Sequence, residues 1–123
     1  MKHLNILVVD DKKVIGDFFD LTMGYYGHKI TVVHNLSDTL RALKQHQFNI
    51  AFIDMMMPGC DGVDVLKEVR ANAHELPVVM MTGYSLEDKR QQAIRLGAVG
   101  CLKKPFEVED IRRVIKEVIQ EDI

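Results

Sequence analysis

The sequence predicts a three-layer α/β domain, in which helices cover both faces of a parallel sheet of five strands. Short runs rich in β-branched residues alternate with longer segments whose apolar residues recur at helical spacing. Strict alternation of this kind is typical of parallel sheets with a helix in each crossover. The chain has 123 residues, and no repeat or Pro/Gly/Ser-rich linker interrupts it. Because this length suits one domain with a substantial core, we expect residues 1–123 to form a single domain.

The five predicted strands differ in how apolar they are. They cover residues 5–9, 29–34, 49–53, 77–82 and 99–103. The first, third and fourth are almost continuously apolar, as expected of central strands. The second carries Lys29 and His34, and the fifth contains Gly100 and ends in lysines, so both are expected at the edges of the sheet. The order 2-1-3-4-5 satisfies these expectations, whereas 3-2-1-4-5 would leave the third strand at an edge. We therefore predict the flavodoxin-like (βα)5 arrangement.

Amphipathic segments between and after the strands predict the helices. Apolar residues share one helical face in residues 15–23, 36–43, 65–69 and 108–119. The fourth helix, at about residues 86–96, has a weaker apolar stripe. Its start is clearer, because Ser85 with Asp88 three positions later is typical of a helix N-terminus. The acidic residues 107–110 are expected to cap the last helix in the same way.

The composition argues against several classes of partner. The formal net charge is −2, which does not favour nucleic acid or an anionic membrane as a direct partner. No apolar stretch approaches the ~18 residues of a membrane span, and the first apolar run is too short for a signal peptide. Cys60 and Cys101 form no CxxC pair, which fits a reducing compartment in which both serve in packing. We expect a cytoplasmic protein.

Polar residues follow four of the predicted strands. The first strand ends in Asp10 and Asp11, the third in Asp54, the fourth in Thr82, and the fifth leads to Lys104. Right-handed crossovers bring the carboxyl ends of parallel strands to one edge of the sheet, where α/β proteins bind ligands. Three carboxylates, a hydroxyl and an ammonium group are therefore expected to converge.

Three converging carboxylates repel one another unless a cation lies among them. Carboxylate oxygens suit Mg²⁺, which needs only one or two carboxylates besides the oxygens of a substrate. The segment DDKK after the first strand has no glycine-rich phosphate loop, so a phosphoryl group would need the metal and Lys104 to neutralise its oxygens. Under these conditions a carboxylate can attack phosphorus and form an aspartyl-phosphate. The pattern predicts a phosphoryl-acceptor site.

The segments ILVVDD, FIDMMMPGCDG, VVMMTGY and CLKKPF resemble, in order and spacing, the signature of response-regulator receiver domains, the CheY-like family of two-component signalling. The resemblance covers essentially the whole chain. It implies that Asp54 accepts a phosphoryl group from a phosphohistidine of a sensor histidine kinase or histidine phosphotransfer protein. It also implies that Asp10, Asp11, Asp54 and the backbone carbonyl of Met56 bind Mg²⁺, for which Mn²⁺ can substitute.

The resemblance assigns roles to later positions as well. It implies that Thr82 and Lys104 contact the phosphoryl group, that Lys103 is only a neighbour, and that a cis peptide between Lys104 and Pro105 aims the lysine. The signal is then expected to leave through the face formed by the fourth helix, fifth strand and fifth helix. A receiver catalyses only its own phosphorylation and dephosphorylation, so no enzymatic turnover is expected.

Three further residues bear on the switch and on the lifetime of the phosphoryl group. Cys101 stands three positions before Lys104, where the family commonly places a tyrosine, phenylalanine or histidine that turns inward when Thr82 moves. We expect signalling to rely on Thr82 and the fourth helix, or on a contribution from Tyr84. Met56 and Tyr84 lie where the family tunes hydrolysis of the aspartyl-phosphate, and their bulk predicts a long-lived phosphoryl group.

Other interpretations stay open from the sequence alone. An aspartate-nucleophile phosphohydrolase would carry DxD after the first strand, where this chain has adjacent aspartates, and a flavodoxin-type electron carrier would need a Ser/Thr-rich phosphate loop there. The motifs look closer to sporulation-phosphorelay and nitrogen-regulator receivers than to flagellar-motor ones. A receiver excised from a longer transcriptional regulator or hybrid kinase is the alternative to a stand-alone protein, which the initiating methionine favours. We expect a monomer or weak dimer.

The remaining candidates are expected to be structural. Met55 and Met57 should fill the core, as methionines usually do. The five histidines are scattered and suggest neither a metal cluster nor a catalytic triad. His34 falls near the end of the second strand, where exposure to solvent is the expectation.

Overall fold

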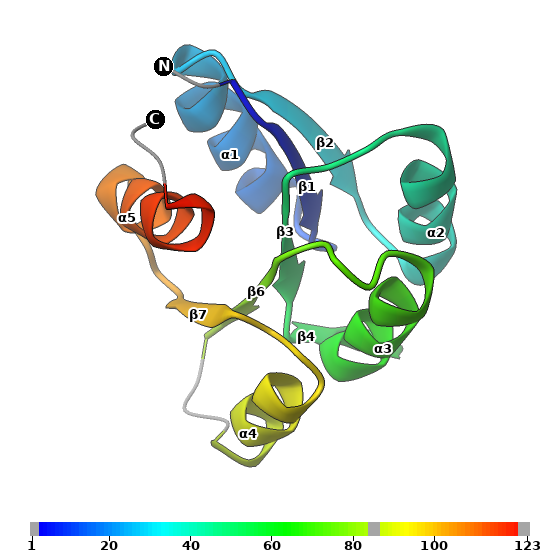
Figure 1. Cartoon of the computed structure of the whole chain (residues 1–123). Coiled ribbons are helices and arrows are strands. Elements are labelled where there is room, and N and C mark those ends of the chain that lie inside the picture. Colours follow the sequence, from blue (N-terminus) through cyan, green and yellow to red (C-terminus); the bar gives the residue numbers. More distant parts are fainter. Residues whose placement is uncertain (1–2, 84–86, 121–123) are drawn as a thin grey trace.

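The computed structural model describes residues 3–83 and 87–120, and they form an α/β sandwich (Figure 1). The strands of the main sheet are β1 (Asn5–Val9), β2 (Lys29–Val33), β3 (Ile50–Asp54), β6 (Val78–Thr82) and β7 (Gly100–Lys103). The helices are α1 (Lys13–Tyr25), α2 (Leu36–Gln45), α3 (Gly62–Asn72), α4 (Glu87–Arg95) and α5 (Val108–Ile119). A short hairpin of β4 (Met56–Met57) and β5 (Cys60–Asp61) lies between β3 and α3.

The main sheet confirms the predicted strand order. Its strands run β2-β1-β3-β6-β7 and every neighbouring pair is parallel (Figure 1). The central strands β1 and β3 are buried along their length except at Asn5, whereas β2 and β7 are only partly buried, as expected of edges. In this register Val9 pairs with Ile53, so β1 and β3 end side by side.

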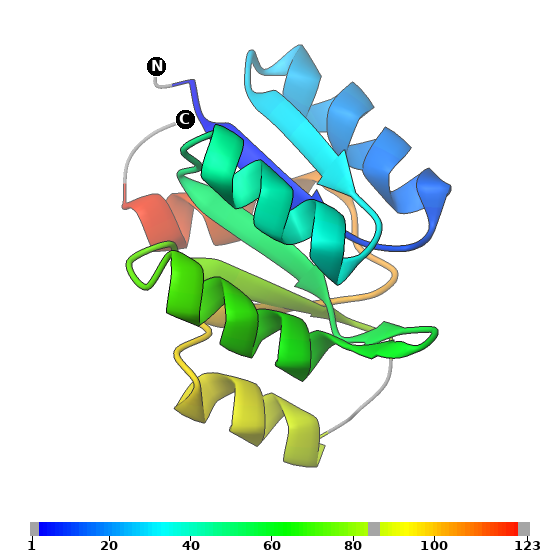
Figure 2. The ribbon, with the colours of Figure 1, turned by 90° about the vertical axis from the view of Figure 1, so that its right-hand side faces the viewer.

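The sheet separates two hydrophobic cores. Figure 2 shows α2, α3 and α4 on one face of the sheet, with α1 and α5 on the other. Successive residues of β3 point to opposite faces, so Ala51 and Ile53 join the first core while Ile50 and Phe52 join the second. The ring of Phe52 packs on that of Phe19 from α1, with centroids 4.9 Å apart. Because both faces are covered, the central strands are apolar at every position.

Capping hydrogen bonds to side chains mark where α2 and α5 begin. Asn35 precedes α2, and its side-chain oxygen accepts a hydrogen bond of 2.8 Å from the backbone N–H of Asp38. At α5, the backbone N–H of Glu107 donates to the Asp110 carboxylate at 2.8 Å, which confirms the cap expected of the acidic run. Ser85, the expected cap of α4, lies outside the described residues. Within residues 3–83 and 87–120, no helix combines the length and apolarity needed to cross a membrane.

The β4–β5 hairpin is an addition to the elements predicted from the sequence. Met57 pairs with Cys60 across a turn in which Gly59 adopts a positive φ of 69°, a conformation that favours glycine. Strands of two residues are too short to show an alternating pattern, so the sequence gives no periodic signal for them. The side chains of Met55 and Met57 are buried, in agreement with the expected packing role.

Candidate functional site

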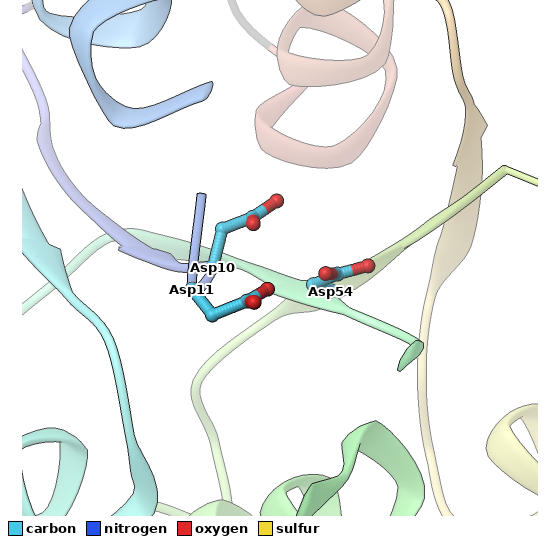
Figure 3. Close-up of side chains that lie close together, drawn as sticks. All are labelled: Asp10, Asp11 and Asp54. Atoms are coloured by element: carbon cyan, nitrogen blue, oxygen red, sulfur yellow. The ribbon is translucent and has the colours of Figure 1, made fainter. Parts of the chain in front are cut away.

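Three carboxylates gather where β1 and β3 end. Asp10 and Asp11 follow β1 directly, and Asp54 is the last residue of β3. Figure 3 shows the three side chains side by side at this edge. One oxygen of each carboxylate lies within 4.8 Å of one oxygen of the other two. The arrangement follows from the parallel register of β1 and β3, which places their carboxyl ends next to each other.

Lys104, which follows β7, brings a positive charge to the same edge. Its ammonium group donates to Asp10 Oδ2 at 2.9 Å and lies 3.2 Å from Asp54 Oδ1. The backbone N–H of Lys104 donates to the carbonyl of Thr82 at 2.7 Å, and the peptide bond between Lys104 and Pro105 is cis. Lys103 is exposed and takes no part in these ion pairs. The lysine next to the proline therefore faces the carboxylates.

Asp10 is held at several atoms. The backbone N–H of Lys12 donates to Asp10 Oδ1 at 2.9 Å, while Oδ2 accepts from Lys104. Its backbone N–H continues the sheet by donating to the carbonyl of Val33 at 3.1 Å. The side chain of Asp10 is fully buried, so these bonds replace the water that its charge would otherwise require.

The electrostatics of the site oppose ionisation of Asp54. Burial and the neighbouring Asp10 carboxylate raise the pKa of Asp54, although Lys104 and the backbone N–H of Met56 oppose the increase. Burial by itself would lower the pKa of Lys104, but the hydrogen bonds and charges of Asp10 and Asp54 outweigh it and raise that pKa. One ammonium group thus compensates the carboxylates incompletely, because the pKa of Asp54 stays above its ordinary value.

Two buried oxygens of the site indicate room for a further cation. Asp11 Oδ1 and Asp54 Oδ2 have no hydrogen-bond partner among the described residues. Lys12 is the nearest additional cation, with its Nζ 3.6 Å from Asp11 Oδ1 and 4.0 Å from Asp54 Oδ2. Buried carboxylate oxygens without partners are destabilising, and oxygen ligands suit a hard divalent cation. The donor set at this edge therefore fits Mg²⁺.

The other residues expected at the site lie around this cluster. Thr82 ends β6, one position beyond the pair formed by Met81 and Asp54. The backbone N–H of Met56 is 3.4 Å from Asp54 Oδ1, and its side chain is 51% exposed. Cys101 lies in β7, partly buried and opposite Met80 in register. Tyr84 falls outside the described residues.

A cleft of about 630 Å³ opens beside the carboxylates. Asp54, Lys12 and Lys104 line its polar part, and Met56 borders it. Apolar residues of α1 and of the segment after β7, such as Val14 and Phe106, line the remainder. The cleft therefore combines a charged side at Asp54 with an apolar side formed by α1 and the segment after β7.

Two residues contact the site although no role in it was predicted for them from the sequence. Gly62 begins α3 against the backbone of Asp54 and Met55, where no side chain fits. A glycine at a helix start after a Pro-Gly turn is the signal that could have found it. His34 is exposed, as expected, but its Nδ1 lies 2.8 Å from the backbone carbonyl oxygen of Asp10. A hydrogen bond from a side chain to a distant backbone group leaves no pattern in the sequence.

Known proteins with similar sequences or structures include transcriptional regulators. The chain is 31% identical over 117 residues to the transcriptional regulatory protein FixJ of Bradyrhizobium diazoefficiens, covering 95% of this chain and 57% of FixJ. It is 27% identical over 122 residues to the uncharacterized transcriptional regulatory protein YkoG of Bacillus subtilis, covering 99% of this chain and 54% of YkoG. The chain thus spans about half the length of these curated relatives.

A solved structure also resembles this chain closely. NtrX from Brucella abortus superposes with a TM-score of 0.91 at 29% identity, over 97% of this chain and 28% of the NtrX chain. The family model of the response regulator receiver domain matches residues 6–116, which include both aspartates after β1, Asp54 and Lys104. The strand order and the acidic edge of the structure are consistent with this family match. This chain therefore belongs to the response regulator receiver family.

Proposed function

We propose that this chain accepts a phosphoryl group on Asp54 from a phosphohistidine, in a reaction that depends on Mg²⁺. The observation that carries the proposal is the convergence of three carboxylates and Lys104 at the ends of β1, β3 and β7. Phosphoryl acceptance is the general function of the receiver family, to which the chain belongs. In this reaction one carboxylate oxygen of Asp54 bonds to phosphorus as the bond between phosphorus and the imidazole nitrogen of the donor breaks.

Different residues around Asp54 would hold the metal and the phosphoryl group. Asp10, Asp11 and the backbone carbonyl of Met56 would hold Mg²⁺ together with Asp54 itself. When bound, the metal would neutralise charge on the phosphoryl oxygens and on the carboxylates. Lys104, whose ammonium group pairs with Asp10 and Asp54, would contact another phosphoryl oxygen, and Thr82 would contact a third. Attachment of a phosphoryl group to Asp54 would remove the carboxylate charge of this residue and would therefore change these contacts.

The apolar rim of the cleft supports a protein donor. Val14 is 68% exposed and lies beside the cleft, and Leu21 and Tyr25 of α1 are exposed as well. Val14, Phe18, Leu21 and Tyr25 recur at intervals of four, three and four residues, so they share one face of the helix. We propose that a sensor histidine kinase or histidine phosphotransfer protein packs against this face while its phosphohistidine enters the cleft.

The signal would leave through α4, β7 and α5. Lys104 directly follows β7, and its backbone N–H is bonded to Thr82 at the end of β6, so changes at the phosphoryl group reach this face through the backbone. Cys101 replaces the usual ring in β7 and has too small a side chain to act in the same way. We therefore propose that Thr82 and α4, with or without Tyr84, carry the switch.

The phosphoryl group is proposed to be long-lived. The Met56 side chain borders the cleft at Asp54 and is large enough to hinder a water molecule that approaches phosphorus. Replacing it by a smaller polar residue, Met56→Asn, should speed loss of the phosphoryl group. Loss of the group from the native chain within seconds, without a phosphatase, would contradict this proposal.

Incubation with acetyl phosphate tests the main proposal. In the presence of Mg²⁺, intact-mass spectrometry should find one phosphoryl group on the native chain and none on Asp54→Asn. Asp64→Asn, which removes an exposed carboxylate of α3, is the matched control and should be phosphorylated like the native chain. Addition that persists in Asp54→Asn, or is independent of Mg²⁺, would refute the assignment. Repeated hydrolysis of phosphomonoesters would indicate a phosphohydrolase instead.

A further inference from the structure

The side chain of His34, the residue after β2, reaches the acidic edge from a strand that supplies none of the carboxylates. Its ring nitrogen Nδ1 lies 2.8 Å from the backbone carbonyl oxygen of Asp10. A carbonyl oxygen only accepts hydrogen bonds, so Nδ1 must carry the proton and donate it. We propose that His34 is a positioning residue, which holds the peptide between Asp10 and Asp11 in the geometry needed to bind Mg²⁺.

The hydrogen bond takes the place of the sheet ladder at the point where β2 ends. The backbone N–H of Asp10 still donates to the carbonyl of Val33, the last residue of β2, at 3.1 Å. Asp10 directly follows β1, and the donor to its carbonyl oxygen is the His34 ring. Asp10 is therefore fixed at its N–H, at both carboxylate oxygens and at its carbonyl.

The hydrogen bond to this carbonyl also restrains the backbone of Asp11. The carbonyl of Asp10 and the N–H of Asp11 belong to one rigid peptide plane. A bond to the carbonyl oxygen therefore restrains the backbone torsions on either side of the plane and the direction in which the Asp11 side chain leaves. Asp11 Oδ1 is buried and accepts no hydrogen bond among the described residues, and its ion pair with the exposed Lys12 is 3.6 Å long. The orientation of the Asp11 side chain thus rests largely on its backbone.

His34 is itself held firmly enough for this role. The residue before it ends β2, and the residue after it, Asn35, caps α2 through bonds to Asp38 and Thr39. Because the backbone is fixed on both sides of His34, its side chain loses little conformational freedom when it forms the hydrogen bond. Partners that orient a metal ligand from outside typically change metal affinity when removed. The His34 ring is such a partner, acting through the backbone.

Isosteric substitutions separate positioning from general stability. Asparagine carries an amide N–H close to the place of histidine Nδ1, whereas leucine has a similar shape and no donor. Mg²⁺ should bind His34→Leu about tenfold more weakly than the native chain, the low end of losses for an outer partner of a metal ligand. His34→Asn should bind it like the native chain. His74→Leu, which alters an exposed histidine in the segment after α3, is the control and should also match the native chain.

Three measurements decide the outcome. Titration of the unphosphorylated variants with Mg²⁺, followed by the amide NMR signals of Asp11 and Lys12, gives the dissociation constants. Thermal unfolding shows whether His34→Leu still folds; if it does not, His34→Ala takes its place. The ¹⁵N signals of the His34 ring in the native chain report which nitrogen carries the proton. A neutral ring protonated on Nε2, or unchanged Mg²⁺ affinity in the folded variant without a donor, would overturn the proposal.

This inference rests on the proposed function only through the metal site. Phosphorylation rates from acetyl phosphate should show the same loss at low Mg²⁺ and recover at saturating Mg²⁺, because positioning affects metal binding first. A native chain that binds Mg²⁺ but is never phosphorylated on Asp54 would defeat the proposed function and leave the role of His34 standing. A native chain that is phosphorylated, with His34→Leu indistinguishable from it in Mg²⁺ affinity, would defeat the role of His34 alone.

Discussion

Gly62 packs against the backbone of Asp54 so closely that a single added methyl group would overlap with the Asp54 carbonyl oxygen. The first residue of α3 and the proposed phosphoryl acceptor are therefore in direct contact. The backbone N–H of Gly62 also donates to the carbonyl of Met55 at 3.0 Å. The position of the Asp54 backbone thus depends on a residue that has no side chain.

Gly62→Ala should destabilise the chain by about 1 to 3 kcal/mol, the usual cost of forcing an extra methyl group into a packed site. It should also slow phosphorylation at saturating Mg²⁺, because relief of the overlap must move the backbone of Asp54. Urea denaturation and incorporation from acetyl phosphate measure the two effects. Gly24→Ala is the control: its Cβ meets no atom within 4 Å in the exposed part of α1, and the change should stabilise the helix slightly. Equal stability of the two variants would contradict the contact.

Asp54→Asn should stabilise the chain in the absence of divalent cations. The folded state raises the pKa of Asp54, first through burial and then through Asp10, so its ionised form is disfavoured in the fold. Stability from such a group is present below its ordinary pKa and is lost as the pH rises through the raised value. We expect a gain of about 1 kcal/mol or more at pH 7 from removing the charge.

Mg²⁺ provides the check on this prediction. Saturating Mg²⁺ should stabilise the native chain more than Asp54→Asn, because ligands that bind only the folded state raise stability by mass action. The advantage of the variant should therefore shrink or reverse. Asp20→Asn, which changes an exposed carboxylate of α1, should respond to neither condition. A destabilised Asp54→Asn in chelator at pH 7 would show that the carboxylates are compensated after all.

His28 should make the stability of the fold fall below pH 6.5. Its side chain is buried, and its Nδ1 accepts a hydrogen bond of 3.0 Å from the backbone N–H of Leu4. Burial, with smaller contributions from His3 and Arg112, lowers the pKa of His28, so the fold favours the neutral ring. Its stabilising contribution is complete above the ordinary pKa and is lost as the pH falls through the lowered value.

Urea midpoints at pH 7.5 and 5.5 measure this dependence. His28→Asn keeps an acceptor for the Leu4 N–H and cannot become charged, so its stability should fall by about 1 kcal/mol less than that of the native chain over this interval. His46→Asn, at an exposed position after α2, should retain the native slope. Parallel pH profiles of the native chain and His28→Asn would refute the prediction.

Arg70→Met should destabilise the chain by about 1 to 3 kcal/mol. The Arg70 guanidinium donates to the carbonyls of His74 at 2.7 Å and of Leu76 at 2.8 Å, which lie in the segment between α3 and β6. Methionine keeps most of the side-chain volume but leaves these carbonyls without the donor. Arg41→Met, which removes an exposed pair with Asp38, should change stability by less than about 0.5 kcal/mol. Thermal or urea unfolding of both variants decides the matter, and similar losses would contradict it.

The sheet and the acidic edge could be predicted because both depend on patterns that the sequence displays. Continuous apolar runs identified β1, β3 and β6 as central strands, and the parallel topology then placed Asp10, Asp11 and Asp54 together. The β4–β5 hairpin escaped prediction because its strands are shorter than any periodic signal. The bond from His34 to Asp10 escaped for a different reason, since it joins two residues 24 positions apart through one ring nitrogen and one backbone oxygen.

The ion pair of Asp10 and Lys104 joins residues that are 94 positions apart in the chain. The three aspartates come from the first half of the chain, whereas Lys104 directly follows β7, the edge strand that pairs with β6. A truncation that removes β7 would therefore take away the Lys104 charge while leaving all three carboxylates in the chain. The charge balance of the acidic edge thus depends on the pairing of an edge strand.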